Sequence, residues 1–514
     1  MRLVAGLFAV GLALAGPAEQ WWRHVEYLAS DELEGRGTGS PGHQKAVEYV
    51  SKHLREAGLK PCGTKGYRQP MALVERKLDE SQSRLALVRD GQEKELKLGS
   101  DAVLSTRTDL AESLDAGLVF AGYGLSIPEQ GYDDLAGLDL KGKVVVYLSG
   151  SPDSVPGPLR AHFSSAGERA KALLRAGAVG SLSIPNPKNS DVPWARTVQA
   201  RLIPSMAQGY TSLDETKGVR FSGSINPDTA GQLFAGTEYK LEDLMALSTA
   251  SKPLPRFPLK MALRAKSKVE RRQLVSDNVC GMLPGTVKES VVLSAHLDHL
   301  GRSATASGDQ VYNGAMDNAS GIATLIEVAR SLKERKERPR RTLVFLAVTG
   351  EEKGLIGSRF FASFPTVPAM VANINFDMYL PLHPLEYIMA LGLEESTLRQ
   401  PLEEVSTRLK LKVQPDLEPQ RNRFIRSDQY SFIQKGVPAL ALKFGYEPKS
   451  AADQIQKEWI AKRYHAVSDD LSQPVDRQAA THFNKVIEEL ALAVANQAER
   501  PRWNEASFFR RFAQ

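Results

Sequence analysis

Cysteine is nearly absent from this chain, which has 514 residues and only Cys62 and Cys280. That scarcity excludes a small domain held together by several disulfides. One bridge between the two cysteines and two free thiols are both compatible with the sequence. The chain also lacks a run of lysine and arginine interleaved with aromatic residues, and its net charge of +6 is small for its length. We therefore expect no nucleic acid partner.

Beyond its first residues, the chain has no apolar run long enough to span a bilayer. The N-terminal text MRLVAGLFAVGLALAGPA carries one arginine, an apolar run and small residues near its end. This pattern is typical of a cleaved secretory signal peptide, which we assign to residues 1–18. We expect an exported protein, periplasmic or secreted, with no stable membrane insertion after cleavage. The sequence leaves the oligomeric state open.

The length and texture of the chain indicate two domains. Hydrophobic residues make up 42% and charged residues 25%, as in folded globular proteins, and 514 residues exceed one ordinary core. Residues 105–255 have short apolar strands and many glycines, and the proline-rich text PLPRFPL that follows suggests a linker. We expect residues 105–255 to form an inserted α/β domain, serving substrate access, partner binding or simply spacing.

The stretch from Val291 to Glu352 contains a strand, a loop, a helix and a second strand in order. The first apolar run ends at His296, and the second, residues 342–348, is followed closely by Glu351 and Glu352. Continuous apolar runs of this length are typical of strands buried on both faces. The sequence thus leaves polar groups at two strand ends.

Three further polar residues lie at the ends of expected elements. Asp317 stands just before a helix that Ser320 can cap, Asp377 lies near the end of the strand VANINFDMYL, and His465 follows Tyr464 in YHAVSDDL. In open α/β sheets, chemistry is usually found at the carboxyl ends of the strands. We therefore expect these residues and those after the first two strands to meet in one site.

Two imidazoles and three carboxylates suit zinc, or less selectively cobalt or manganese. The five candidate ligands are His296, Asp317, Glu352, Asp377 and His465. A single catalytic zinc takes three protein ligands and keeps one position open, so five ligands fit better as two metals that share a carboxylate about 3.5 to 4 Å apart. The sequence therefore predicts two Zn²⁺ per chain.

Two more carboxylates complete the predicted chemistry. Neighbouring side chains on an extended segment point apart, so Glu352 can hold metal while Glu351 faces the reacting water as general base. Asp298 follows His296 by two residues, and its carboxylate can accept the far imidazole proton and fix the ligating tautomer. His299 either supports a ligand or packs in the interior.

At this point the chain resembles a known family, the co-catalytic zinc aminopeptidases, which also include glutamate carboxypeptidases and glutaminyl cyclases. The motifs that carry the resemblance are AHLDHLG, YNGAMDNASG, AVTGEEKGLIGSR, NINFDM and YHAVSDD. It extends over nearly the whole chain after the signal peptide. It implies an α/β fold with a mixed, mostly parallel central sheet flanked by helices. It also implies that residues 105–255 are a smaller protease-associated domain, inserted into a peptidase domain of residues 19–104 and 256–514.

Position by position, the resemblance implies that Asp317 bridges two zinc ions. Glu352 and His465 complete one zinc site, and His296 and Asp377 complete the other. The implied activity is removal of N-terminal residues from peptide substrates by a metal-bridging hydroxide.

The resemblance also assigns supporting roles. It makes Glu351 the general base, gives Tyr464 a part in stabilising the tetrahedral intermediate, and implies a cis peptide between Asp317 and Asn318. One departure is visible, because Met316 stands where many members have a first aspartate. The bridging ligand itself is retained, so we expect metal binding to survive.

Three other functions remain open. A carboxypeptidase acting on acidic C-termini would need a basic pocket, which Arg421, Arg423 and Arg426 could supply. A glutaminyl cyclase of the same fold generally works with one zinc, and a non-catalytic relative loses ligands. The complete set of five ligands disfavours the last two, and peptides blocked at either terminus would separate the two exopeptidases.

Overall fold

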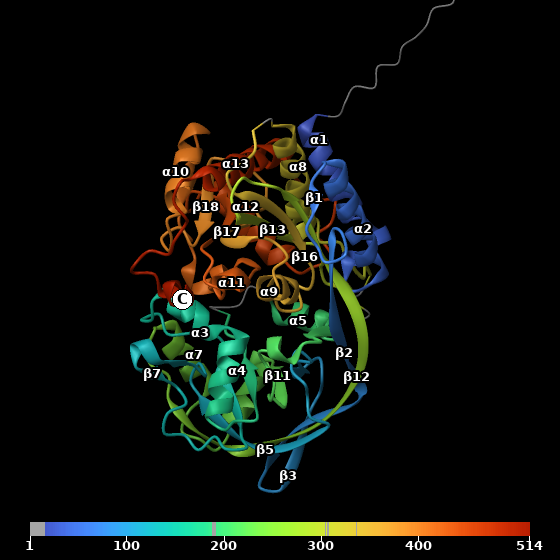
Figure 1. Cartoon of the computed structure of the whole chain (residues 1–514). Helices are drawn as coiled ribbons and strands as arrows, with labels where there is room; N and C mark the ends of the chain where they lie inside the picture. The colour runs from blue at the N-terminus through green and yellow to red at the C-terminus, as the bar shows by residue number, and fades with distance from the viewer. Residues whose placement is uncertain (1–15, 188–191, 304, 306–307, 336, 514) are drawn as a thin grey trace, which may run out of the picture.

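The structure is a computed structural model. It describes residues 16–187, 192–303, 305, 308–335 and 337–513. Residues 1–15 of the predicted signal peptide lie outside the described residues. The chain folds into two lobes, one above the other in Figure 1. We call the residues 16–61 and 279–513 the large lobe and the residues 78–265 the small lobe; each has its own hydrophobic core. No helix among the described residues is long and apolar enough to cross a membrane.

A mixed, mostly parallel sheet forms the centre of the large lobe, as predicted. In spatial order its strands are β19 (Lys412–Gln414), β18 (Tyr387–Leu391), β20 (Ala439–Gly445), β17 (Ala369–Asn375), β13 (Glu289–His296), β16 (Thr342–Val348) and the end of β12 (Arg256–Leu283). Neighbours β20, β17, β13 and β16 run parallel. Strand β12 pairs antiparallel with β16, and β18 pairs antiparallel with β20 but parallel with β19. The four parallel strands therefore end at one edge of the sheet.

Helices cover both faces of this sheet, which explains its continuous apolar runs. One face packs against α2 (Pro41–Glu56), α8 (Ser320–Glu334) and α13 (Arg477–Asn496), and α1 (Pro17–Leu28) packs on α8 and α13. The other face packs against α9 (Ile356–Ser363) and α11 (Gln429–Ile433). Alternate residues of β13 serve the two cores: Leu293 belongs to the first and Val292 to the second. Every position of β16, and every position of β13 after Glu289, is buried, as in other parallel sheets covered by helices.

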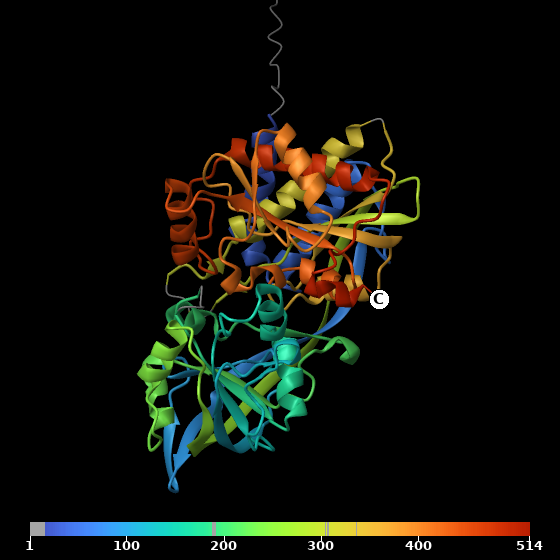
Figure 2. The same ribbon diagram turned by 90° about the vertical axis from the view of Figure 1, so that its left-hand side faces the viewer.

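The small lobe is a second α/β unit built on the same long strands. It consists of β5 (Ser113–Ala121), β8 (Val144–Leu148), β9 (Gly180–Ile184), β11 (Phe221–Ile225) and β4 (Ala102–Leu104), in that spatial order after β12. The helices α3 (Gly157–Ser164), α4 (Ala166–Arg175), α5 (Trp194–Ala200) and α7 (Leu241–Thr249) accompany it (Figure 2).

The small lobe's core does not divide from the rest at residues 105 and 255, because Leu85, Leu96 and Leu263 all belong to it. The proline-rich text PLPRFPL lies largely inside β12. The prediction of a linker at this place is therefore wrong. Pro258 sits where the register between β12 and β5 shifts, a position at which a strand tolerates a residue without an N–H. Strands β12 and β2 (Arg68–Arg89) pair along most of their length and connect the lobes.

Cys62 and Cys280 form a disulfide, which decides between the two alternatives left by the sequence. The bridge joins the segment after β1 (Lys60–Pro61) to β12, and both cysteines are buried. It links residues 218 positions apart in the chain.

Candidate active site

The predicted ligands meet at the edge where the parallel strands end. His296 is the last residue of β13, Glu352 follows β16, and Asp377 follows β17. Pairing of His296 with Val348 and of Ser294 with Asn375 brings these three strand ends to the same level.

Two other elements add the remaining ligands. Asp317 lies just before α8, and His465 lies in the loop between α12 (Ala451–Lys462) and α13. We predicted that Ser320 caps α8, but it is the first residue of the helix and does not cap it. Its hydroxyl donates to the carbonyl of Met316 at 2.8 Å.

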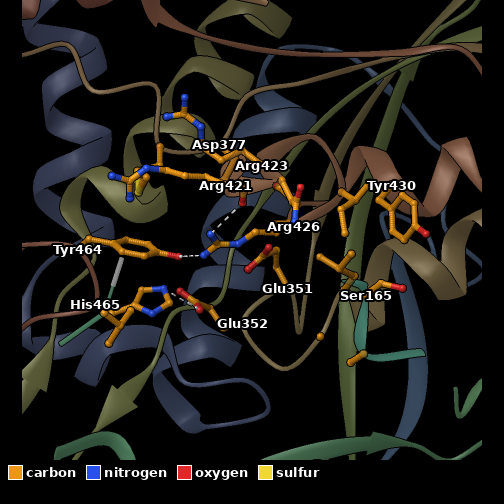
Figure 3. Close-up of a pocket in the computed structure, with 18 of the residues that line it drawn as sticks. Ser165, Glu351, Glu352, Asp377, Arg421, Arg423, Arg426, Tyr430, Tyr464 and His465 are labelled. Carbon is orange, nitrogen blue, oxygen red and sulfur yellow. Dashed lines mark hydrogen bonds and ion pairs between the residues drawn. The ribbon is translucent and has the colours of Figure 1, made fainter. Parts of the chain in front are cut away.

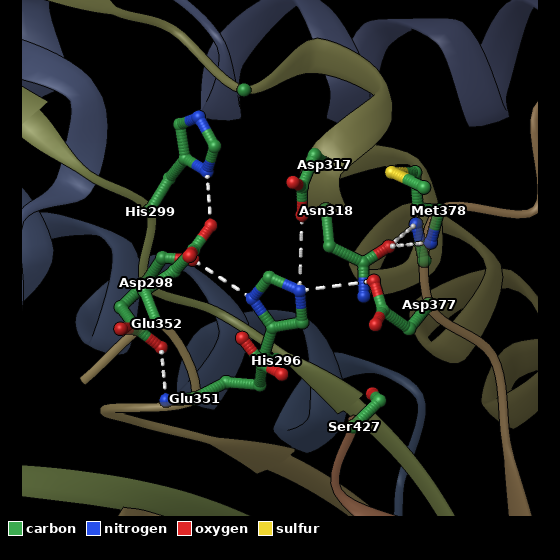
Figure 4. A network of polar contacts seen from close by, with 12 residues as sticks. His296, Asp298, His299, Asp317, Asn318, Glu351, Glu352, Asp377, Met378 and Ser427 are labelled. Atoms are coloured by element: carbon green, nitrogen blue, oxygen red, sulfur yellow. Dashed lines mark hydrogen bonds and ion pairs between the residues drawn. The ribbon is translucent and has the colours of Figure 1, made fainter. Parts of the chain in front are cut away.

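Asp317 presents one carboxylate oxygen to His296 (Figure 4) and the other to His465. His296 Nε2 is 3.2 Å from Asp317 Oδ1 and 3.1 Å from Asp377 Oδ1. His465 Nε2 is 3.5 Å from Asp317 Oδ2 and 3.2 Å from Glu352 Oε2. All five predicted ligands therefore converge in two sets that share Asp317.

Burial and charge act strongly on these groups. Burial opposes the charged form of each, yet nearby carboxylates raise the pKa of His465 to about 10 and that of His296 well above its usual value. Burial likewise opposes ionisation of Glu352, but His465 and His299 hold the pKa of its carboxyl well below the usual range. The site thus concentrates negative charge and stabilises cations placed within it.

These donors fit a zinc centre. Imidazole nitrogens and carboxylate oxygens are zinc donors, and the ligand atoms of His296, Asp317 and Asp377 all lie within 4.8 Å of one another. A second such group consists of His299, Asp317 and Glu352. Each of these groups could therefore hold an ion.

Asp298 contacts His296, but not as we predicted. The imidazole Nδ1 lies 2.9 Å from the backbone carbonyl of Asp298. The carboxylate of Asp298 accepts instead from Thr38 Oγ1 at 2.7 Å and from the backbone N–H of Glu351 at 3.1 Å. The prediction that the carboxylate orients His296 is therefore wrong, because the turn after β13 brings the main chain to the imidazole first. Asp298 positions Glu351 instead.

His299 supports a ligand, one of the two roles left open for it. The side chain is fully buried, and its Nδ1 lies 2.8 Å from Glu352 Oε1. A histidine hydrogen-bonded to a ligating carboxylate fixes the orientation of that carboxylate. Its place in the same short motif as His296 and Asp298 was the signal available in the sequence.

Glu351 and Tyr464 both line the cavity beside the ligands (Figure 3). Burial, reinforced by the nearby carboxylates Glu352 and Asp377, raises the pKa of Glu351 well above its usual value. A carboxyl with a raised pKa is a better proton acceptor. The Tyr464 hydroxyl accepts from Arg426 at 3.4 Å, and its ring lies 4.0 Å from that of His465.

The loop around the central ligand has two features that bear on the resemblance. The peptide between Asp317 and Asn318 is cis, as predicted. Met316, the visible departure, is fully buried in the large-lobe core. The N–H groups of Met316 and Asp317 both donate to the carboxylate of Asp469 at 3.0 Å. Sequence reasoning missed Asp469, although it lies within the motif YHAVSDD that contains His465.

The cavity has a volume of about 1080 Å³ and is lined by both lobes. From the large lobe it receives Arg421, Arg423 and Arg426, which Figure 3 shows gathered between Tyr464 and Asp377. From the small lobe it receives Arg107 and Trp194. The volume is at the upper end for ligand pockets, enough for several groups of a bound molecule.

Comparisons with known proteins agree with these motifs. Residues 278–491 match the family model described as "Peptidase family M28". A segment of 49 residues is 55% identical to a probable zinc metalloprotease of Pyricularia oryzae, covering 10% of this chain and 9% of that protein. A segment of 114 residues is 31% identical to leucine aminopeptidase 1 of Trichophyton equinum, covering 21% and 30%. The chain thus spans less than a third of the length of either relative.

A solved structure shares the fold over a greater length. The aminopeptidase from Aneurinibacillus sp. strain AM-1 superimposes with a TM-score of 0.56 and 18% identity, covering 95% of this chain and 98% of that one. At this identity the likeness concerns the fold alone. Residues 278–491, which contain all five candidate ligands, match the model of peptidase family M28, in agreement with the resemblance of the motifs.

Proposed function

We propose that this chain is a zinc-dependent aminopeptidase that removes N-terminal residues from peptides with two zinc ions. The observation that carries this proposal is the position of Asp317, which presents one carboxylate oxygen to each histidine. Two bound zinc ions would supply Lewis acidity that polarises the scissile carbonyl and lowers the pKa of a water molecule.

The remaining chemistry belongs to the chain's own groups. Glu351 lines the cavity without serving as a ligand, so its carboxylate takes the proton of the attacking water and passes it to the leaving amine. The Asp298 carboxylate accepts a hydrogen bond from the backbone N–H of Glu351 at 3.1 Å and so fixes the position of this residue. Tyr464 donates its hydroxyl proton as a hydrogen bond to the developing oxyanion, and Arg426 beside it favours that negative charge.

The test is metal content measured by mass spectrometry, together with hydrolysis of a panel of aminoacyl-p-nitroanilides. Two zinc per chain and chelator-sensitive release of nitroaniline are the expected results. Zinc without release from any member of the panel would contradict the aminopeptidase activity. Absence of bound metal after zinc is added back would contradict the metal site as well.

A carboxypeptidase acting on acidic C-termini is the second candidate. It is favoured by one observation, the three arginines at positions 421, 423 and 426 in the cavity wall. Arg423 is partly neutralised by Asp416 at 2.6 Å, and Arg421 by Glu418 at 2.9 Å. Peptides acetylated at the N-terminus separate the candidates, because only a carboxypeptidase cleaves them.

Export also forms part of the proposal. It is supported by the N-terminal sequence pattern and by the buried disulfide, since disulfides persist mainly in oxidising compartments. N-terminal sequencing of the protein recovered outside the cytoplasm of its host should give a start near residue 19. We further propose that the core of the small lobe is a protease-associated domain.

A further inference from the structure

The two halves of the candidate zinc site are held in different ways. His296 ends β13 and Asp377 follows the neighbouring parallel strand β17, so hydrogen-bonded strands fix both. His465 lies in a loop, and its backbone adopts a left-handed φ of 53°. Its side chain is 25% exposed, whereas that of His296 is 1% exposed. The half formed by Glu352 and His465 therefore depends more on outside support.

The small lobe supplies support to this half. Arg196 of α5 donates to the backbone carbonyls of Ile460, Ala461 and Tyr464, at the end of α12 and just before His465. Arg107, also from the small lobe, donates through Nη2 to the backbone carbonyl of Glu352 at 2.9 Å. Each arginine thus contacts the main chain of a ligand or of the residue beside it.

Further contacts hold α5 against the large lobe. The hydroxyls of Ser303 and Thr305 both donate to the carbonyl of Gln199 at 2.5 Å. Within its own lobe, the loop of His465 is held by Asp469, which accepts from the N–H groups of Met316 and Asp317, and by Arg426, which donates to the Tyr464 hydroxyl at 3.4 Å. Arg196 therefore holds the loop on the side of Tyr464, and Asp469 holds it four residues beyond His465.

We propose that the small lobe sets the zinc affinity of the half-site formed by Glu352 and His465, with Arg196 and Arg107 as positioning residues. This inference rests on the proposed function, because it needs two zinc ions. The physical reason is that an imidazole on a loop can turn away from the ion unless its backbone is fixed. Loss of groups that orient metal ligands typically weakens binding about 10- to 100-fold. In the other half-site, His296 and Asp377 are held by strands, so this half-site does not need these arginines.

The experiment is stepwise competition for zinc between the full chain and a chromophoric chelator. The wild-type protein should bind two zinc ions; binding of fewer would contradict the proposed function itself, separately from this inference. In Arg196→Ala we expect one zinc to bind about 10- to 100-fold more weakly while the other is unchanged. Arg107→Ala should weaken the same zinc.

A conservative variant and a matched control sharpen the test. Arg196→Lys should recover part of the lost affinity, because an ammonium group can donate to some of the three carbonyls but lacks the planar fork. Arg201→Ala removes an arginine next to α5 that pairs with Glu80 inside the small lobe at 2.9 Å. It should leave both affinities unchanged.

A double variant identifies which half-site is affected. His465→Ala removes the loop ligand, so adding Arg196→Ala to it should leave the affinity of the remaining zinc unchanged. If Arg196→Ala weakens both zinc ions equally, or weakens neither, the inference is wrong. An additional loss in the His465→Ala background would also overturn it, because the arginine would then act on the strand-borne half.

Discussion

The two lobes are built alike but end their strands differently. In the small lobe, β5, β8 and β9 run parallel and are followed by Gly122, Ser149 and Pro185. In the large lobe, the parallel strands end at His296 or lead into Glu351 and other carboxylates. Both groups of possible metal ligands among the described residues belong to the large lobe. Similar architecture therefore carries chemistry only where polar residues occupy the strand ends.

The strongest test of this comparison is Glu351→Gln. The amide keeps the shape of the side chain but cannot accept a proton, so we expect kcat/KM for aminoacyl-p-nitroanilides to fall about 10²- to 10⁴-fold. Both zinc ions should remain, because Glu351 is not among the ligands. Metal content and steady-state kinetics on the same preparation check the two statements.

The small lobe provides the matched control, Glu168→Gln. Glu168 lies on α4, where it forms an ion pair with Lys171 at 2.6 Å, and it is not at a strand end. We expect its kcat/KM to stay within about twofold of wild type, because Glu168 does not line the cavity and its ion pair is with an exposed lysine. Near-normal turnover of Glu351→Gln would refute the base assignment and remove the proposed difference between the lobes.

A second prediction asks whether the lobes are independent in stability. Phe345 on β16 and Phe120 on β5 are both fully buried, one in each lobe. Replacing either by alanine should lower the free energy of unfolding by about 3–5 kcal/mol. Because β2 and β12 pair through both lobes, we expect both variants to shift one shared thermal transition.

Calorimetry distinguishes the possibilities. Two transitions, of which each variant moves only one, would show that the long strands do not couple the lobes. Activity at low temperature should survive in Phe120→Ala, provided that the protein remains folded.

Removal of the disulfide should have a similar or smaller effect on the free energy of unfolding. The bridge closes a loop across 218 positions, and disulfides of this kind stabilise a protein by about 2–4 kcal/mol, mainly by restricting the unfolded chain. The double variant Cys62→Ser, Cys280→Ser should therefore unfold at a lower denaturant concentration. An unchanged midpoint in urea would contradict this expectation.

The large lobe was readable from the sequence because its strands are buried on both faces. The run Thr342–Val348 matches β16 residue for residue. Three of the five ligands, His296, Glu352 and Asp377, could be predicted because they stand at or near the end of an apolar run. A change from apolar to polar is a strong local signal.

Features that depend on distant contacts could not be read in this way. The pairing of Cys62 and Cys280 depends on how β1 lies against β12. The long strand β12 alternates exposed and buried residues near its start, so its prolines suggested a linker. The prediction for Asp298 was wrong because the sequence does not show whether its backbone carbonyl or its carboxylate contacts His296.

The smallest predicted effect compares one buried histidine from each lobe. Burial lowers the pKa of His43 to about 3 and that of His162 to about 4. His162 Nδ1 lies 2.6 Å from the Tyr430 hydroxyl at the contact between the lobes, and Glu168, at 3.9 Å, partly opposes the lowering.

Between about pH 6.5 and 4 the unfolded chain therefore binds protons at both histidines that the folded chain does not, so stability falls as pH falls. At pH 5 each histidine should cost about 2 kcal/mol relative to pH 7. Urea denaturation at several pH values checks this, with His43→Gln and His162→Gln each expected to flatten the dependence. If the lobes unfold as one unit, both variants flatten the slope of the same transition. A flattened slope for only one of them would mean that the other histidine titrates alike in the folded and unfolded chain.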